Sequence, residues 1–125
     1  MGKAVLIVDD EPYIRQLIEQ TLEELEDAGV ELLTADNGLD ALEIIQEAQP
    51  QVVFLDVMMP KMNGFDVCYT VKREWGWDSI YVVMLTAKGQ EYDKQKGKEV
   101  GADVYITKPF DPDDLLALTQ NVLGL

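Results

Sequence analysis

Five polar residues, each at the end of an apolar run, are of the types that could carry phosphoryl chemistry. They are Asp9, Asp10, Asp56, Thr86 and Lys108. An aspartate carboxylate can attack phosphorus as a nucleophile. A lysine ammonium and a threonine hydroxyl can then donate to the phosphoryl oxygens, because catalysis of this kind consists mostly of positioning and charge neutralisation. The chemistry depends on whether the fold brings these residues together.

Apolar segments of strand length alternate along the chain with amphipathic segments of helix length. The expected strands span residues 4–8, 31–35, 52–55, 80–85 and 104–107. The expected helices begin at Pro12 with Asp10 as N-cap, at Asn37-Gly38, at Gly64, near Gln90, and at Pro112 with Asp111 as N-cap. Buried strands that alternate with helices predict a parallel, doubly wound α/β sheet with right-handed crossovers.

The carboxyl ends of the strands are the edge where such sheets bind ligands. If the first and third strands are neighbours, Asp9, Asp10 and Asp56 converge there, and their like charges repel. Lys108 supplies one compensating charge, and a divalent cation would supply the rest. Because the ligands are hard oxygens, we expect Mg²⁺, or Mn²⁺, rather than zinc.

Composition excludes several other classes of protein. The 125 residues carry a net charge of −14, so direct binding of nucleic acid by this domain is not expected. The chain has no histidine, which excludes a Ser-His-Asp group and means that a partner must supply any phosphohistidine. No apolar run is long enough to span a membrane, and a single cysteine fits a reducing compartment, so we expect a cytoplasmic protein. The first strand leads into Asp-Asp-Glu-Pro and not into a glycine-rich turn, which argues against a nucleotide or flavin site.

The chain resembles the receiver domain of two-component response regulators over nearly its whole length. No single motif carries the resemblance, but their order and their places at strand ends are specific. The motifs are Val8-Asp9-Asp10-Glu11, the stretch from Leu55-Asp56 through Pro60 to Gly64, Leu85-Thr86-Ala87, Gly101-Ala102-Asp103 and Lys108-Pro109-Phe110.

The resemblance implies a role for each site residue. Asp56 would accept a phosphoryl group from the phosphohistidine of a partner histidine kinase or histidine phosphotransfer protein. Asp10, Asp56 and the backbone carbonyl of Met58 would ligate Mg²⁺, with Asp9 acting through a bound water. Thr86 and Lys108 would contact the phosphoryl oxygens. The Lys108-Pro109 peptide bond would be cis.

The resemblance also implies a switch and an architecture. Tyr105 would turn inward when Thr86 moves toward the phosphoryl group, and the output face would comprise the fourth helix, fifth strand and fifth helix. The alternative for Tyr105 is an edge residue with its hydroxyl in water. The implied fold is flavodoxin-like, a (βα)5 arrangement with strand order 2-1-3-4-5, and residues 1–125 would form a single receiver domain without an effector domain.

Two departures from the family pattern bear on assembly. Val104 replaces an acid that is common in the subfamily that precedes DNA-binding domains, and the last helix lacks that subfamily's arginines and lysines. The dimer of that subfamily depends on ion pairs across the face that contains the last helix. Because this chain lacks those charges, we expect a monomer or a weak dimer.

Two other functions compete with a phosphorylation-driven switch. A pseudo-receiver would be a protein-binding scaffold that takes no phosphate, but it should lack one of the acids, the threonine or the lysine. A phosphohydrolase that turns over free substrate would need a second acid-base group beside Asp56, and neither Met58 nor Lys88 is an obvious base. We therefore expect a signalling domain, not an enzyme in the usual sense, that dephosphorylates itself slowly.

Three further features have structural interpretations. Cys68 is expected to be a small core residue. Trp75 and Trp77 are expected to pack over a helix end, with a partner contact as the alternative. The helix near residues 90–100 is polar and contains Gly97, so we expect it to be the least stable helix.

Overall fold

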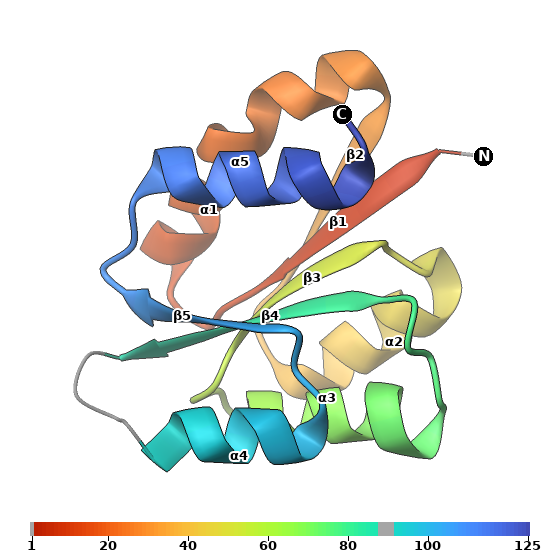
Figure 1. Cartoon of the computed structure of the whole chain (residues 1–125), viewed down its shortest axis with the longest axis vertical. Helices are drawn as coiled ribbons and strands as arrows, with labels where there is room; N and C mark the ends of the chain where they lie inside the picture. Colours follow the sequence, from red (N-terminus) through yellow and green to blue (C-terminus); the bar gives the residue numbers. More distant parts are fainter. Residues whose placement is uncertain (1, 88–91) are drawn as a thin grey trace.

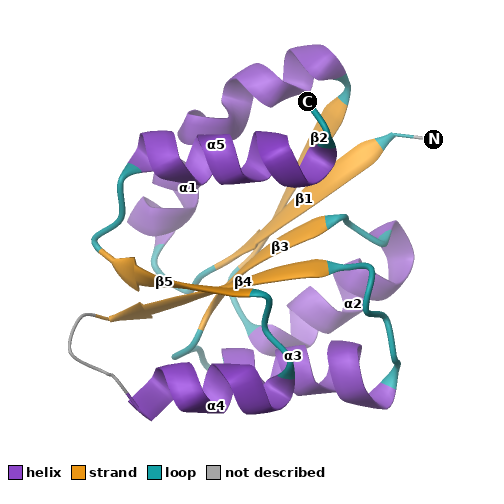
Figure 2. Cartoon of the chain, in the orientation of Figure 1, coloured by secondary structure: helices purple, strands orange, loops and turns teal. Residues whose placement is uncertain are grey.

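The computed structural model describes residues 2–87 and 92–125, and its centre is one parallel sheet (Figures 1 and 2). The strands lie in the order β2-β1-β3-β4-β5. They span β1 Lys3–Val8, β2 Val30–Ala35, β3 Val52–Asp56, β4 Tyr81–Ala87 and β5 Val104–Lys108. Every neighbouring pair is parallel. The doubly wound (βα)5 fold and its strand order are therefore confirmed.

Helices cover both faces of the sheet (Figure 1). Their bounds are α1 Pro12–Leu22, α2 Gly38–Ala48, α3 Gly64–Tyr69, α4 Tyr92–Val100 and α5 Pro112–Leu123. On one face, Ile18 of α1 and Leu115 of α5 pack with Phe54 of β3. On the other, Ile45 of α2 and Cys68 of α3 pack with Leu55. Alternate residues of the central strands thus enter two separate cores, which explains their continuous apolar runs.

The helix ends follow the sequence in part. Asn37 caps α2 by accepting from the Asp40 N–H, and Asp111 caps α5 by accepting from the Asp113 N–H. The prediction that Asp10 caps α1 was wrong. The N-cap is Glu11, whose side chain makes no capping bond.

Two helices change their winding before they end. α1 continues as a 3₁₀ helix, η1 Glu23–Ala28, and α3 continues as a π-helical turn, η2 Thr70–Glu74. Lys72 lies in this π turn with its side chain only 4% exposed, and its Nζ is 2.9 Å from Asp103 Oδ2. The π turn therefore places a buried lysine against the segment that joins α4 to β5.

The cysteine and the tryptophans lie as expected. Cys68 is fully buried, and burial raises the pKa of its thiol to about 12. The rings of Trp75 and Trp77 are 4.9 Å apart and pack against the core beyond the end of α3. In the described part of the chain, no helix has both the length and the apolar character that a membrane crossing requires.

Candidate functional site

Side chains from three strand ends meet at the carboxyl edge of the sheet. Asp9 follows β1, Asp56 ends β3 and Lys108 ends β5. Asp56 and Lys108 border a cavity of about 510 Å³ at the surface, and Asp9 lies buried behind it. The cavity is lined by Asp10, Glu11, Ile14, Asp56, Val57, Met58, Ala87, Lys108 and Pro109. The structure therefore brings together residues that are as much as 99 positions apart in the chain.

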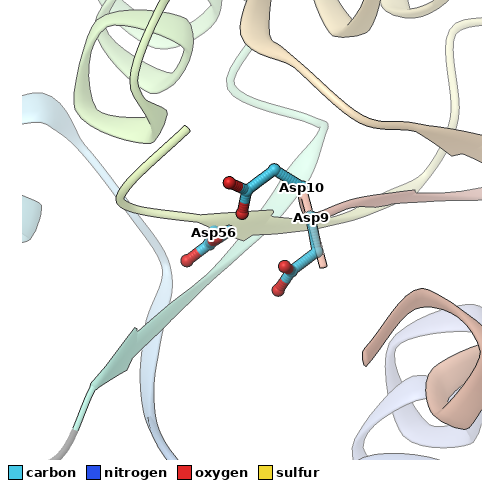
Figure 3. Close-up of side chains that lie close together, drawn as sticks. All are labelled: Asp9, Asp10 and Asp56. Atoms are coloured by element: carbon cyan, nitrogen blue, oxygen red, sulfur yellow. The ribbon is translucent and has the colours of Figure 1, made fainter. Parts of the chain in front are cut away.

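The three predicted acids form one cluster (Figure 3). An oxygen from each of Asp9, Asp10 and Asp56 lies within 4.8 Å of the others. Asp9 is fully buried, Asp56 is 6% exposed, and Asp10 is open to solvent. Three convergent carboxylates with one open side match the preference of Mg²⁺ for a few carboxylates plus water. The donor set thus fits a hard divalent cation.

Lys108 supplies the positive charge of the cluster. Its Nζ lies 2.8 Å from Asp9 Oδ2, 3.4 Å from Asp56 Oδ1 and 3.7 Å from Glu11 Oε1. Burial lowers the pKa of Lys108, but the hydrogen bond to Asp9 and the charges of Asp56 and Asp9 outweigh it, so the net shift is upward. The ammonium therefore stays protonated. The Lys108-Pro109 peptide bond that follows is cis.

Asp56 has the most strongly shifted pKa of the acids whose side chains the structure describes. Burial is the main cause of the rise from 3.8 to about 7, and the charge of Asp9 and a hydrogen bond with Asp10 add to it. Lys108 acts in the opposite direction without reversing the shift. Like charges in a partly dry site explain this pattern. A cation that entered the cluster would favour the carboxylate form of Asp56.

Gly64 lets the chain return close to Asp56. The Gly64 N–H donates to Val57 O at 2.9 Å. A Cβ at Gly64 would overlap the carbonyl oxygen of Asp56 and lie 3.1 Å from the Val57 Cα. On the other side, the Val57 N–H donates to Leu85 O of β4 at 3.1 Å. The backbone that carries Asp56 is therefore held from both directions.

The remaining predicted residues surround this cluster. Thr86 is buried in β4, one position beyond the residue that pairs with Asp56. The Met58 side chain is 69% exposed at the cavity rim. Tyr105 of β5 pairs with Met84, and its hydroxyl oxygen is buried, so the alternative with this hydroxyl in water does not describe the structure. Lys88 falls outside the described residues.

Two residues of the site were not singled out by the sequence. Glu11 approaches Lys108 from the N-cap of α1. The Arg15 guanidinium donates from Nη1 to the backbone oxygen of Asp9 at 2.7 Å. Glu11 stands in the Val8-Asp9-Asp10-Glu11 motif but was given no role of its own, and Arg15 belongs to none of the motifs. The available signal for Arg15 was its place in the first turn of the helix that follows Asp9-Asp10.

Comparisons with known proteins agree with this geometry. Residues 5–120 match the family model described as the response regulator receiver domain. The phosphate regulon transcriptional regulatory protein PhoB of Pseudomonas aeruginosa is 45% identical over 123 residues, which cover 98% of this chain and 52% of that protein. The chain thus spans about half the length of this and several other curated relatives.

Solved structures agree as well. The chemotaxis protein CheY4 of Vibrio cholerae has a TM-score of 0.82 and 39% identity, with 98% of this chain and 99% of that one covered. The BeF3-activated receiver domain of DrrB, a Thermotoga maritima protein, has a TM-score of 0.86 and 33% identity, with both chains fully covered. The fold, the acid cluster and the family match lead to one conclusion: the chain belongs to the response regulator receiver domain family.

Proposed function

We propose that this chain is a phosphorylation-activated signalling switch in which Asp56 accepts the phosphoryl group. The observation that carries the proposal is the position of Asp56 at a cavity bordered by two further acids, with Lys108 Nζ 3.4 Å from its carboxylate. The donor would be the phosphohistidine of a histidine kinase or of a histidine phosphotransfer protein. The chain has no histidine of its own to serve as that donor.

The transfer step makes one bond and breaks another. A carboxylate oxygen of Asp56 attacks phosphorus, and the bond from phosphorus to the imidazole nitrogen of the donor breaks. The imidazole keeps the electron pair, and Asp56 becomes an acyl phosphate. Lys108 stabilises the negative charge on the transferred group, and the Thr86 hydroxyl donates to another phosphoryl oxygen. Ala87, next to Thr86, lines the cavity and leaves room for the group.

A divalent cation fits the proposal. Asp10, Asp56 and the Met58 carbonyl would hold Mg²⁺, and Asp9 would act through water. When bound, the ion would neutralise charge on the phosphoryl oxygens. Asp9 has a second task, because its Oδ2 holds the Lys108 ammonium at 2.8 Å. The acids would thus hold the cation, and Asp9 would also hold the lysine, so both positive charges would be available to the phosphoryl group.

Phosphorylation would change the positions of Thr86 and Tyr105. The two lie on neighbouring strands, β4 and β5, so a shift of Thr86 toward the phosphoryl group would change the packing of Tyr105. Tyr105 contacts α4 through Gly97, so the change would reach the face formed by α4, β5 and α5. An output partner would bind there. The similar protein PhoB of Pseudomonas aeruginosa is a transcriptional regulatory protein of the phosphate regulon, which supports a signalling role here.

The cavity supports slow self-dephosphorylation and not turnover of free substrate. Among the residues that line it, Lys108 already contacts carboxylates, Glu11 is paired with Lys108, and Asp10 is the proposed metal ligand. None of the lining residues is therefore left over as a second acid-base group beside Asp56. The test is incubation with acetyl phosphate and Mg²⁺, followed by intact-mass measurement. We expect one added phosphoryl group on the wild-type chain and none on Asp56→Asn. A wild-type chain that gains none would instead fit a protein-binding pseudo-receiver.

A further inference from the structure

Arg15 of α1 makes an unusual contact for an arginine in an acidic surface. Its Nη1 donates to the backbone oxygen of Asp9 at 2.7 Å. Four acids line the surface cavity beside it, namely Asp36, Asp40, Glu43 and Glu47. None of the ion pairs found among the described residues involves Arg15. The guanidinium thus donates to a peptide oxygen in the turn that carries Asp9 and Asp10, and not to a neighbouring carboxylate.

This oxygen belongs to the peptide group that joins Asp9 to Asp10. The peptide group is planar, so a donor that fixes its oxygen also fixes the direction in which the chain enters Asp10. The peptide group before it is held separately, because the Asp9 N–H donates to Ala35 O at 3.2 Å. The one after it is held by the Glu11 N–H, which donates to Asp9 Oδ1 at 2.9 Å. Arg15 thus supplies the bond that fixes the middle of three consecutive peptide groups.

Asp10 needs this support more than the other two acids do. The Asp9 carboxylate is buried and bonded to Lys108, and Asp56 ends a central strand. Asp10 is exposed and lies beyond the end of β1. Its orientation therefore depends on the backbone of the turn. A side chain at the first turn of a helix leans toward the helix N-terminus, which explains how Arg15 reaches back to that turn.

We infer that Arg15 is a positioning residue for metal binding: it fixes the Asp9–Asp10 peptide plane and thereby aims the Asp10 carboxylate at the cation. The inference rests on the proposed function. Partners that orient metal ligands typically contribute about 10- to 100-fold to affinity. Arg15 is not among the residues that line the cavity at Asp56, so its loss should change the concentration of metal required and not the chemistry at saturation.

The test is Mn²⁺ binding by the full chain, measured from the electron paramagnetic resonance signal of the free ion. Arg15→Gln should weaken binding about tenfold. Arg15→Lys should weaken it less, because an ammonium can donate to the same carbonyl but lacks the planar fork. Arg73→Gln is the matched control, because it removes the chain's other arginine from an exposed site on η2. It should bind Mn²⁺ as the wild type does.

A second readout separates positioning from general damage to the fold. Phosphorylation of Arg15→Gln by acetyl phosphate should be slow at low Mg²⁺ and return to within about twofold of wild type at saturating Mg²⁺, the recovery expected when an interaction that acts only on binding is lost. Unchanged Mn²⁺ affinity in both Arg15 variants, or an equal loss in Arg73→Gln, would overturn the inference. If Arg15→Gln does not fold, the Mn²⁺ affinity of Arg15→Lys alone tests the inference: weaker binding than the wild type supports it and unchanged binding overturns it. A wild-type chain that binds no Mn²⁺ would instead refute the proposed function, and the inference with it.

Discussion

The ring of Tyr105 occupies the space that a side chain at position 97 would need. A Cβ placed on Gly97 would lie 2.7 Å from Cδ2 and 2.8 Å from Cε2 of that ring. Gly97 is buried within α4, where glycine costs about 1 kcal/mol relative to alanine. The chain tolerates this cost because the glycine makes room for the tyrosine. Position 97 and the placement of Tyr105 are therefore coupled.

Gly97→Ala should destabilise the protein in spite of the better helix propensity of alanine. The added methyl group must displace the ring, and overpacking of this kind costs about 1–3 kcal/mol. In a Tyr105→Ala background the ring is absent, so the same substitution should stabilise the protein by up to about 1 kcal/mol. Urea unfolding of the wild type, the two single variants and the double variant measures both changes. A substitution effect of the same sign in both backgrounds would contradict the coupling.

The raised pKa of Asp56 predicts how stability depends on pH when no metal is present. Between the unfolded pKa near 3.8 and the folded pKa of about 7, the folded state holds a proton that the unfolded state has released. The stability from this proton is present at low pH and is lost as pH rises through about 7. Its slope is at most about 1.4 kcal/mol per pH unit.

Asp56→Asn isolates this effect from the rest of the chain's acids. Unfolding by urea in the presence of a chelator, at several pH values between 4 and 8, should show a shallower decline of stability for Asp56→Asn than for the wild type. The difference between the two should level off above pH 7. Parallel curves would mean that Asp56 has an ordinary pKa in the folded protein.

The acids of the cluster should respond differently to removal. Asp10 is exposed and accepts no hydrogen bond from Lys108. At pH 8, above the pKa of about 7 of Asp56, the Asp10 and Asp56 carboxylates share no proton. Asp10→Ala should then relieve repulsion and raise the metal-free melting temperature by a few degrees, about 4 °C for each kcal/mol. Asp9→Ala should lower it, because Lys108 and the Glu11 N–H each lose a bond. Mg²⁺ should raise the melting temperature of the wild type. Calorimetry measures these melting temperatures. Equal shifts in Asp9→Ala and Asp10→Ala would refute the different roles given to the two acids.

The buried Lys72 should contribute to stability through Asp103. Its ammonium also donates to Asp78 O at 3.2 Å, and Asp103 Oδ2 accepts from the Val82 N–H at 2.8 Å as well. Lys72→Met keeps most of the apolar stem but removes the contacts of Lys72 with Asp103 and with Asp78 O, so we expect a loss of about 1–3 kcal/mol. Lys96→Met, on the exposed side of α4, is the control and should change little. A chemical denaturation series on both variants gives the comparison.

The sequence was sufficient for the strands and for the acid cluster because both depend on local pattern. Val53 and Phe54 lie in an unbroken apolar run, and such runs in a βα alternation leave few topologies. Asp56 and Lys108 could be brought together because each ends a strand, and strand ends of a parallel sheet share one edge. The caps Asn37 and Asp111 followed from the same local chemistry.

The features that the sequence did not reveal depend on partners that are distant along the chain or on the exact residue at which a helix begins. Asp10 does not cap α1 because the helix begins with Pro12 at its first position, which makes Glu11 the N-cap. The burial of Lys72 depends on a π turn and on Asp103, 31 positions later, and no periodicity predicts either. The reason for Gly97 lies in another element, β5. Helix propensity at that position indicated a weak helix but not the ring that requires the glycine.

Phosphorylation at Asp56 is the central claim, and intact mass measures it most directly. The wild type, Asp56→Asn and the exposed control Asp27→Asn would be incubated with acetyl phosphate, each with Mg²⁺ and with a chelator. We predict one added phosphoryl group on the wild type and on Asp27→Asn, only with Mg²⁺, and none on Asp56→Asn. Full modification of Asp56→Asn, or none of the wild type with Mg²⁺, would contradict the account.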